Sequence, residues 1–356
     1  MAEVRGRVKT GLEPVRNAFA EMLSADPAGS ALAVDLNGEM IIDLWGGARD
    51  AARGLSWERG TLVHTYSVTK PFAATALLLL IDRGVVGLDD PVAAYWPEFA
   101  SEGKDGLPIR WLLTHQAGLE VLPEPQPPEV LLDWDRFCAA LAAARPSWEP
   151  GTRQGEHALT FGHLVGEVVR RVDGRTVGGL LREELPWLDF RIGLTAGEQE
   201  LCAEVSGVSP ALAQDARWQR ALANPPGVLD PDVVNGIAYR AAEVPAVNGH
   251  GTARAVARFY GALLGGELLS ENLRDQALYP QATGIDEVVG EYLSWGLGLQ
   301  VDDDGFGMGG VGGAFGGASR TGGYGIGFLP AHMGDYERVD RLERVLRECL
   351  GVPPLK

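Results

Sequence analysis

Patterns that are typical of β-strands lie near the two ends of the sequence and are scarce between them. Near the start, "ALAVDLNGEMIIDLWGGA" reads as two strands around Asn37-Gly38, a strong short-range signal for a hairpin turn. Near the end, three glycine-rich runs have a similar β-like character: "SWGLGLQVDD", "GFGMGGVGGAFGGASR" and "GYGIGFLPAHM". We therefore expect both ends of the chain to contribute to one sheet.

Helical periodicity fills the remaining sequence. Val15, Phe19 and Met22 repeat at helical spacing in "EPVRNAFAEML", and "DYERVDRLERVLRECL" near the end is amphipathic. The middle is mostly helical, as in "FGHLVGEVVRRVDGR" and "NGHGTARAVARFYGALLGGELLS". This order predicts an α+β protein in which a helical region is inserted into a sheet domain.

The composition excludes several classes of partner. The 356 residues include 31 basic and 48 acidic ones, and the net charge of −17 repels nucleic acid and anionic membranes. No stretch reaches the roughly 20 apolar residues of a membrane span, and "MAEVRGRVKTGLEPV" lacks the apolar core of a signal peptide. We expect a cytoplasmic protein that binds neither nucleic acid nor membrane. The cysteines, Cys138, Cys202 and Cys349, are too scattered to suggest disulfides or zinc.

Ser67 and Lys70 form an S-x-x-K pair in "VHTYSVTK", just before a long apolar run. On a helix, residues three apart share one face, so a neutral lysine could accept the serine proton. The first turn of a helix also presents unpaired N–H groups that favour a developing oxyanion. The spacing alone is more typical of an N-cap serine followed by a solvated lysine, so the choice depends on the rest of the chain.

Sequence blocks along nearly the whole chain resemble the serine β-lactamase and penicillin-binding-protein superfamily. The likeness is to its class C-like branch, which includes the family VIII carboxylesterases. The blocks, in family order, are "DLWGGARD", "WERGTLVHTYSVTK", "LLLLIDRGVVGLDDPVAAYWPEF", "IRWLLTHQAGL", "WEPGTRQGEHALTFGHLVGEVVRR", "NGHGTARAVARFYGAL" and "WGLGLQ". The resemblance implies an antiparallel sheet with flanking helices in residues 1–75 and 265–356. It also implies a mostly helical domain in 76–264 and a nucleophilic Ser67 at their junction.

Two positions depart from the family pattern. The family's second catalytic motif contains a tyrosine, and the matching block "GEHALT" has Glu156 there, followed by His157. The third motif, K-T-G or H-G-G, aligns with "MGG", which is Met308, Gly309 and Gly310. The resemblance also implies an oxyanion hole made by the backbone N–H groups of Ser67 and Val311, in which no side chain takes part.

Glu156 changes the proton chemistry that is available to Ser67. A carboxylate close to Lys70 should raise the lysine pKa and keep the amine protonated. One arrangement then makes Glu156 the general base and Lys70 a fixed cation. Another is an ion pair that leaves Ser67 inert.

Substrate contacts are expected from His157, Met308, Gly309 and Gly310. Met308 brings no cation, so it removes an anchor for a substrate carboxylate and makes β-lactam hydrolysis unexpected. Its thioether either forms an apolar wall for a neutral substrate or packs within the sheet. For His157 a structural role is the favoured interpretation, and a substrate contact is the alternative.

The leading functional hypothesis is a serine-dependent hydrolase or acyltransferase. It would act on an ester, thioester or amide of a small neutral or apolar molecule through an acyl-enzyme at Ser67, with Lys70 and Glu156. The first alternative is a non-covalent acid/base enzyme that uses Glu156 in the same cleft, and the second is a non-catalytic binding protein. No motif calls for a cofactor or a metal, and the oligomeric state is not predicted.

Overall fold

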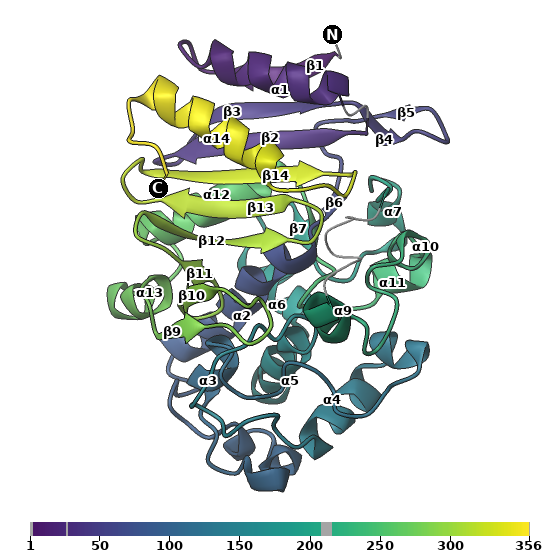
Figure 1. The fold of residues 1–356 in the computed structure, drawn as a ribbon, viewed down its shortest axis with the longest axis vertical. Coiled ribbons are helices and arrows are strands. Elements are labelled where there is room, and N and C mark those ends of the chain that lie inside the picture. Colours follow the sequence, from purple (N-terminus) through teal and green to yellow (C-terminus); the bar gives the residue numbers. More distant parts are fainter. Residues whose placement is uncertain (1–2, 26–27, 208–215, 356) are drawn as a thin grey trace.

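The computed structural model describes residues 3–25, 28–207 and 216–355. Its largest element is a nine-stranded antiparallel sheet in the order β1-β3-β2-β14-β13-β12-β11-β10-β9 (Figure 1). The first three of these strands come from the start of the chain and the other six from its end. The strands are β1 (Val4–Val8), β2 (Ser30–Leu36), β3 (Glu39–Gly46), β9 (Ala282–Ile285), β10 (Tyr292–Trp295), β11 (Gln300–Val301), β12 (Gly305–Gly310), β13 (Ala314–Ser319) and β14 (Tyr324–Pro330).

The predicted sharing of one sheet by the two chain ends is confirmed at the β2–β14 pair, where Ile326 lies opposite Val34. The predicted hairpin is also confirmed, because β2 and β3 pair around Asn37 and Gly38. Both turn residues have positive φ, 53° and 84°, as a two-residue turn that follows the sheet's twist requires.

Two helices cover one face of the sheet. They are α1 (Glu13–Ala25) and α14 (Glu337–Leu350), which pack against each other (Figure 1). Their apolar faces, which include Phe19 and Leu342, form one buried cluster with side chains of the strands, such as Ile42 and Phe328. This confirms that the amphipathic segments near both ends flank the sheet.

Glycines let the opposite face of the sheet approach helix α12 (Ala253–Gly265) closely. A Cβ built on Gly325 would lie 2.3 Å from the carbonyl oxygen of Ala257, and one on Gly327 would lie 2.5 Å from that of Ala253. Any larger residue at these positions of β14 would push the helix away. The glycine-rich strands therefore serve helix packing as well as strand pairing.

The inserted region is mainly helical and is organised around α2, which packs against α5 and α6 and reaches β12. Buried side chains of this region and of the sheet form one continuous apolar cluster. The helices are α2 (Lys70–Asp82), α3 (Ile109–Leu113), α4 (Trp134–Ala143), α5 (Phe161–Asp173), α6 (Val177–Glu184), α7 (Ala196–Gln199), α9 (Ala216–Leu222), α10 (Pro231–Val234), α11 (Ile237–Ala241) and α13 (Glu271–Leu278).

The domain boundaries expected after residues 75 and 264 stay a prediction. Helix α12, which ends near the second of them, packs mainly on the sheet, and its Phe259 also stacks on Phe72 of α2. Within the described part of the chain, no helix combines the length and apolar character needed to cross a membrane.

Short elements connect the sheet to the inserted region. The strands are β4 (Ala48–Asp50) and β5 (Leu55–Ser56), which pair with each other, and β6 (Val63–His64), β8 (His250–Gly251) and β7 (Phe190–Arg191), which form a three-stranded sheet. The 3₁₀ segments are η1 (Tyr66–Thr69), η2 (Val92–Ala94), η3 (Pro97–Gly103) and η4 (Pro128–Leu132). Segment η1 follows β6 directly, so the small sheet fixes where the predicted nucleophile lies.

Candidate active site

Ser67 lies in the 3₁₀ turn η1, directly before helix α2. The preceding residue, Tyr66, has a φ of +47°, which is uncommon for a large side chain. Thr69 stabilises the turn, because its hydroxyl donates to the Tyr66 carbonyl at 2.6 Å and accepts from the Gly249 N–H at 2.8 Å. The sequence predicts Ser67 within the first turn of an α-helix. The α-helix instead begins at Lys70, and the serine lies one tighter turn before it.

Lys70 connects Ser67 to Glu156. Its Nζ donates a hydrogen bond to Ser67 Oγ at 2.8 Å and lies 3.1 Å from Glu156 Oε1. A third contact runs from Nζ to the Ala246 carbonyl at 3.4 Å. The side chains of Lys70 and Glu156 are 0% and 3% exposed, and Ser67 is 4% exposed. The structure thus brings together all three residues that are predicted to be catalytic.

Burial controls the protonation of the Lys70–Glu156 pair. It lowers the pKa of Lys70 and outweighs Glu156, which acts in the opposite direction, so the prediction that Glu156 keeps the lysine protonated is wrong. It also raises the pKa of Glu156, against the effect of Lys70 and with a smaller contribution from Asp286. Both shifts favour the uncharged forms, because transferring a charge out of water is costly. A neutral Lys70 can accept the proton of the Ser67 hydroxyl.

Asp286 holds the backbone around Glu156. This carboxylate is fully buried, and its Oδ1 accepts from the N–H groups of Glu156, Val288 and Val289 at 3.0, 2.9 and 2.9 Å. Its Oδ2 accepts from the indole N–H of Trp295 at 3.0 Å. Four donors therefore converge on one carboxylate, which fixes the segment around Glu156 to the loop between β9 and β10. The sequence does not predict this role of Asp286, because the only local signal is an acidic residue in a turn.

Strand β12 carries the "MGG" residues to the edge of the site. Met308 is 2% exposed and packs with Ala282 and Trp295, as expected of a packed strand residue rather than an open pocket wall. A Cβ on Gly310 would lie 2.5 Å from the carbonyl oxygen of Thr65, so the missing side chain lets β12 approach the nucleophile turn. Gly309 is partly exposed next to this contact.

Val311 follows β12 and opens a tight turn. Its backbone N–H has no hydrogen-bond partner in the part of the chain that the structure describes. Such a free donor, two residues from Gly309, is what an oxyanion hole requires. The pairing of this N–H with that of Ser67 at one oxyanion stays a prediction.

The histidines near the site support its loops. The ring of His157 is fully buried, donates from Nδ1 to the Gly155 carbonyl at 2.8 Å and accepts at Nε2 from the Leu119 N–H at 3.1 Å. Its own N–H donates to His115 Nδ1 at 3.0 Å. Burial lowers the pKa of His157 to about 4, so the ring stays neutral. The substrate contact considered for His157 is therefore corrected to a structural role, because both ring nitrogens are occupied by the main chain.

Tyr336 is a second residue near the site that sequence reasoning missed. Its hydroxyl donates to the carbonyl of Gly310 at 2.9 Å, although the residue lies 26 positions later in the sequence. No local motif marks it, because only the fold brings the start of α14 to the end of β12.

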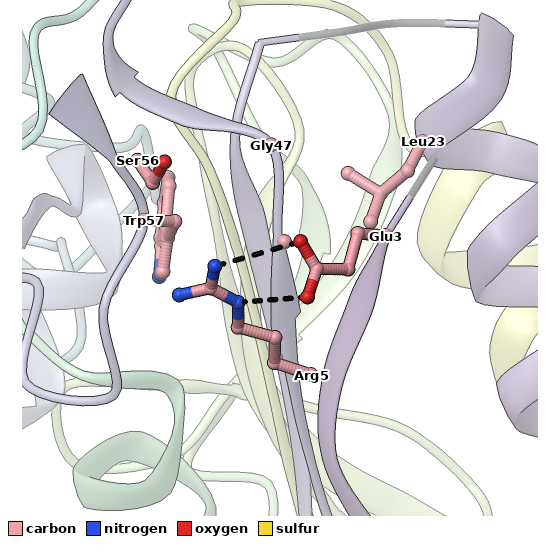
Figure 2. A pocket seen from close by; sticks show the side chains of 7 residues that line it. Glu3, Arg5, Leu23, Gly47, Ser56 and Trp57 are labelled. Carbon is pink, nitrogen blue, oxygen red and sulfur yellow. Dashed lines mark hydrogen bonds and ion pairs between the residues drawn. The ribbon is translucent and has the colours of Figure 1, made fainter. Parts of the chain in front are cut away.

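A hollow of about 200 Å³ lies elsewhere, at the β1 edge of the sheet. Figure 2 shows Arg5 and Glu3 beside Trp57 and Ser56 around it. The Arg5–Glu3 ion pair is largely solvent-exposed, and such pairs contribute little binding energy.

Among the residues that the structure describes, no group of three or more His, Cys, Asp or Glu side chains is arranged to hold a metal ion.

Comparison with known proteins assigns the chain to a family. The family described as Beta-lactamase matches residues 15–348. "Esterase/beta-lactamase LipL" of Mycobacterium tuberculosis (strain ATCC 25618 / H37Rv) is 36% identical over 272 residues, which are 71% of this chain and 63% of LipL. The chain thus matches less than two thirds of that curated relative.

Solved structures agree over a greater length. A family VIII carboxylesterase is 36% identical with a TM-score of 0.89, and 98% of this chain covers 100% of it. A penicillin-binding protein homologue from Caulobacter crescentus is 32% identical with a TM-score of 0.85, and the match again covers 98% of this chain and 100% of the homologue. The resemblance seen in the sequence and the predicted α+β fold are confirmed. The chain belongs to the β-lactamase family.

Proposed function

We propose that the protein is a serine hydrolase of carboxylic esters that acts through an acyl-enzyme at Ser67. The observation that carries this proposal is the 2.8 Å hydrogen bond between Ser67 Oγ and the fully buried Lys70 amine. An inert ion pair would leave the serine turned away, whereas here the serine and the carboxylate both contact Lys70. The names of two similar proteins, an esterase/β-lactamase and a family VIII carboxylesterase, support the same reaction class.

Acylation uses the uncharged pair. Ser67 Oγ attacks the ester carbonyl carbon while its proton passes to the neutral amine of Lys70. The carbon–oxygen bond to the leaving alcohol then breaks, and the departing oxygen takes a proton from the carboxylic acid of Glu156. The products are the acyl-serine, the free alcohol, an ammonium on Lys70 and a carboxylate on Glu156.

Deacylation restores the starting state. Glu156 accepts a proton from the attacking water, whose oxygen bonds to the acyl carbon, and Lys70 returns a proton to Ser67 Oγ as the acyl–serine bond breaks. The pair is uncharged again, and the carboxylic acid product leaves. An alcohol or amine in place of water would give acyl transfer by the same proton movements.

The substrate is a small ester without a charged acyl group. Met308 brings no cation to the position where a lysine would hold a substrate carboxylate, and it is packed into the sheet. Burial of Ser67, Lys70 and Glu156 further disfavours a substrate that carries charge next to the reacting bond.

The test compares wild type with Ser67→Ala on p-nitrophenyl acetate, butyrate and octanoate. Loss of the nucleophile should lower kcat/KM by about 10³-fold or more. A fluorophosphonate should add one adduct per wild-type chain, detected by intact mass, and none to Ser67→Ala. Ser56→Ala, at an exposed serine of β5, is the matched control and should keep both activity and labelling.

Other outcomes select the alternatives. Turnover that survives Ser67→Ala but not Glu156→Gln would indicate non-covalent acid/base chemistry. Absence of any adduct or turnover, together with ligand binding, would indicate a binding protein. Product analysis with added methanol separates transfer from hydrolysis.

A further inference from the structure

The peptide unit between Gly310 and Val311 is held from its carbonyl side. The Gly310 oxygen accepts from Tyr336 Oη at 2.9 Å and from the Gly313 N–H at 3.1 Å. The nitrogen of the same peptide is Val311 N, the predicted oxyanion donor. In a trans peptide the C=O and N–H bonds point in opposite directions, so whatever fixes the carbonyl also fixes the N–H.

We propose that Tyr336 is a positioning residue whose hydroxyl anchors the Gly310 carbonyl and so keeps the Val311 N–H directed at the substrate oxyanion. This inference rests on the proposed serine hydrolase function.

The local sequence explains why an anchor is needed. The turn reads Gly309-Gly310-Val311-Gly312-Gly313, and Gly312 and Gly313 have φ values of 85° and 88°. Glycines on both sides of Val311 impose little restriction on the neighbouring peptides, so alternative orientations are close in energy. A tertiary hydrogen bond selects one of them before the substrate arrives, which is the condition for effective oxyanion stabilisation.

The absence of a side chain at Gly309 leaves room for the Tyr336 hydroxyl to reach the Gly310 carbonyl. A Cβ on Gly309 would lie 2.5 Å from Tyr336 Oη and 2.8 Å from its Cζ. An alanine would therefore displace the hydroxyl while leaving it chemically intact. The start of α14 also holds the next part of the turn, because Arg338 donates to the Gly312 carbonyl at 2.8 Å.

The phenol remains a donor over the working pH range. Although 43% of Tyr336 is exposed, its hydroxyl end lies against β12, and this burial raises the pKa of the phenol above its ordinary value. A neutral phenol that donates to a carbonyl also polarises the peptide, which strengthens the N–H at its other end.

The test is Tyr336→Phe, which keeps the ring and removes the hydroxyl. We expect kcat on p-nitrophenyl butyrate to fall about 10-fold with KM within twofold, less than the 10²–10³ of deleting an oxyanion donor. The inhibition constant of an aryl trifluoromethyl ketone, whose adduct with Ser67 carries an oxyanion, should rise by the same factor. Tyr292→Phe, at a tyrosine of β10 that is 70% exposed, is the control and should change neither value.

Gly309→Ala tests the same contact by displacing the hydroxyl. It should reproduce the loss in kcat, and the double variant with Tyr336→Phe should be no worse than the more impaired single variant. Unchanged kcat and ketone affinity in Tyr336→Phe would overturn the inference, as would a loss confined to KM, which would indicate a substrate contact. Failure of the wild type to form any Ser67 adduct would instead refute the proposed function, and the inference with it.

Discussion

Glu156 is the residue that most separates this site from the pattern that its family resemblance implies. A tyrosine there would be a weak acid with a pKa near 10, whereas a glutamic acid loses its proton near 4 unless its surroundings intervene. Here burial raises the pKa of Glu156 and lowers that of Lys70, which brings the two groups closer in proton affinity. Such a pair can exchange one proton during the reaction, as the two half-reactions require.

Glu156→Gln should separate the two half-reactions. The amide cannot accept a proton from water, so deacylation should slow by about 10²-fold or more. Acylation by p-nitrophenyl esters should persist, because p-nitrophenolate leaves without needing a proton. We expect a burst of one equivalent of p-nitrophenol, followed by slow turnover, with the acyl-enzyme visible by intact mass.

A buried glutamate outside the site provides the control for this burst. Glu343 on α14 is 7% exposed and accepts from Tyr324 at 2.6 Å. Glu343→Gln should show linear release of p-nitrophenol with no accumulated adduct. If Glu156→Gln behaves in the same way, Glu156 does not act in deacylation.

At the scale of elements, the loop between β9 and β10 holds the segment around Glu156 from outside the inserted region. Asp286 supplies both of its carboxylate oxygens to this connection, and each of its four donors is a main-chain or indole N–H. The N–H groups of Glu156 and Val288 and the indole N–H of Trp295 are buried with it, so these three donors cannot find water if the carboxylate is removed. The stability of the hairpin and the placement of Glu156 are therefore coupled.

Asp286→Asn should lower the stability of the β9–β10 hairpin and disturb the placement of Glu156. The amide replaces one acceptor by a donor, which leaves at least one buried N–H unsatisfied at a cost of about 1–3 kcal/mol. We expect the urea midpoint to fall accordingly and kcat to fall with it. Asp302→Asn, at an exposed turn aspartate between β11 and β12, is the control. A stable variant with normal kcat would show that the loop is held by other contacts.

Local patterns predict those parts of the fold that depend on near neighbours in sequence. The Asn37-Gly38 hairpin, the amphipathic helices and the S-x-x-K pair all have short-range signals, and the structure contains each of them. The roles of Asp286 and Tyr336 have no such signal, since each acts on a residue 26 or more positions away. Likewise, the glycines of β14 look like weak strand formers until α12 is seen packed on them.

At the scale of the whole molecule, five buried histidines make the free energy of unfolding depend on pH. They are His64, His115, His157, His163 and His250, and burial lowers the pKa of each. In the unfolded chain the same rings titrate near 6.5. Between the two values these rings bind more protons in the unfolded state, so their contribution to the free energy of unfolding falls as the pH drops below about 6.5.

His163 allows this linkage to be measured away from the active site. Its ring stacks on Phe137 with centroids 3.9 Å apart, and burial lowers its pKa to about 3. His163→Phe keeps an aromatic ring there and removes the titrating group. Relative to wild type, the variant should gain about 1.4 kcal/mol of stability for each pH unit below 6.5, hence about 2 kcal/mol at pH 5.

Urea unfolding followed by tryptophan fluorescence between pH 5 and 7.5 measures that gain. Phe137→Leu disturbs the same stack without removing a titrating group, so its curve of stability against pH should run parallel to that of wild type. His163→Phe should instead cross or approach the wild-type curve as the pH falls, because only this variant loses a group that binds protons more tightly in the unfolded state. Parallel curves for both variants would mean that His163 titrates alike in the folded and unfolded states, and that its burial does not contribute to acid unfolding.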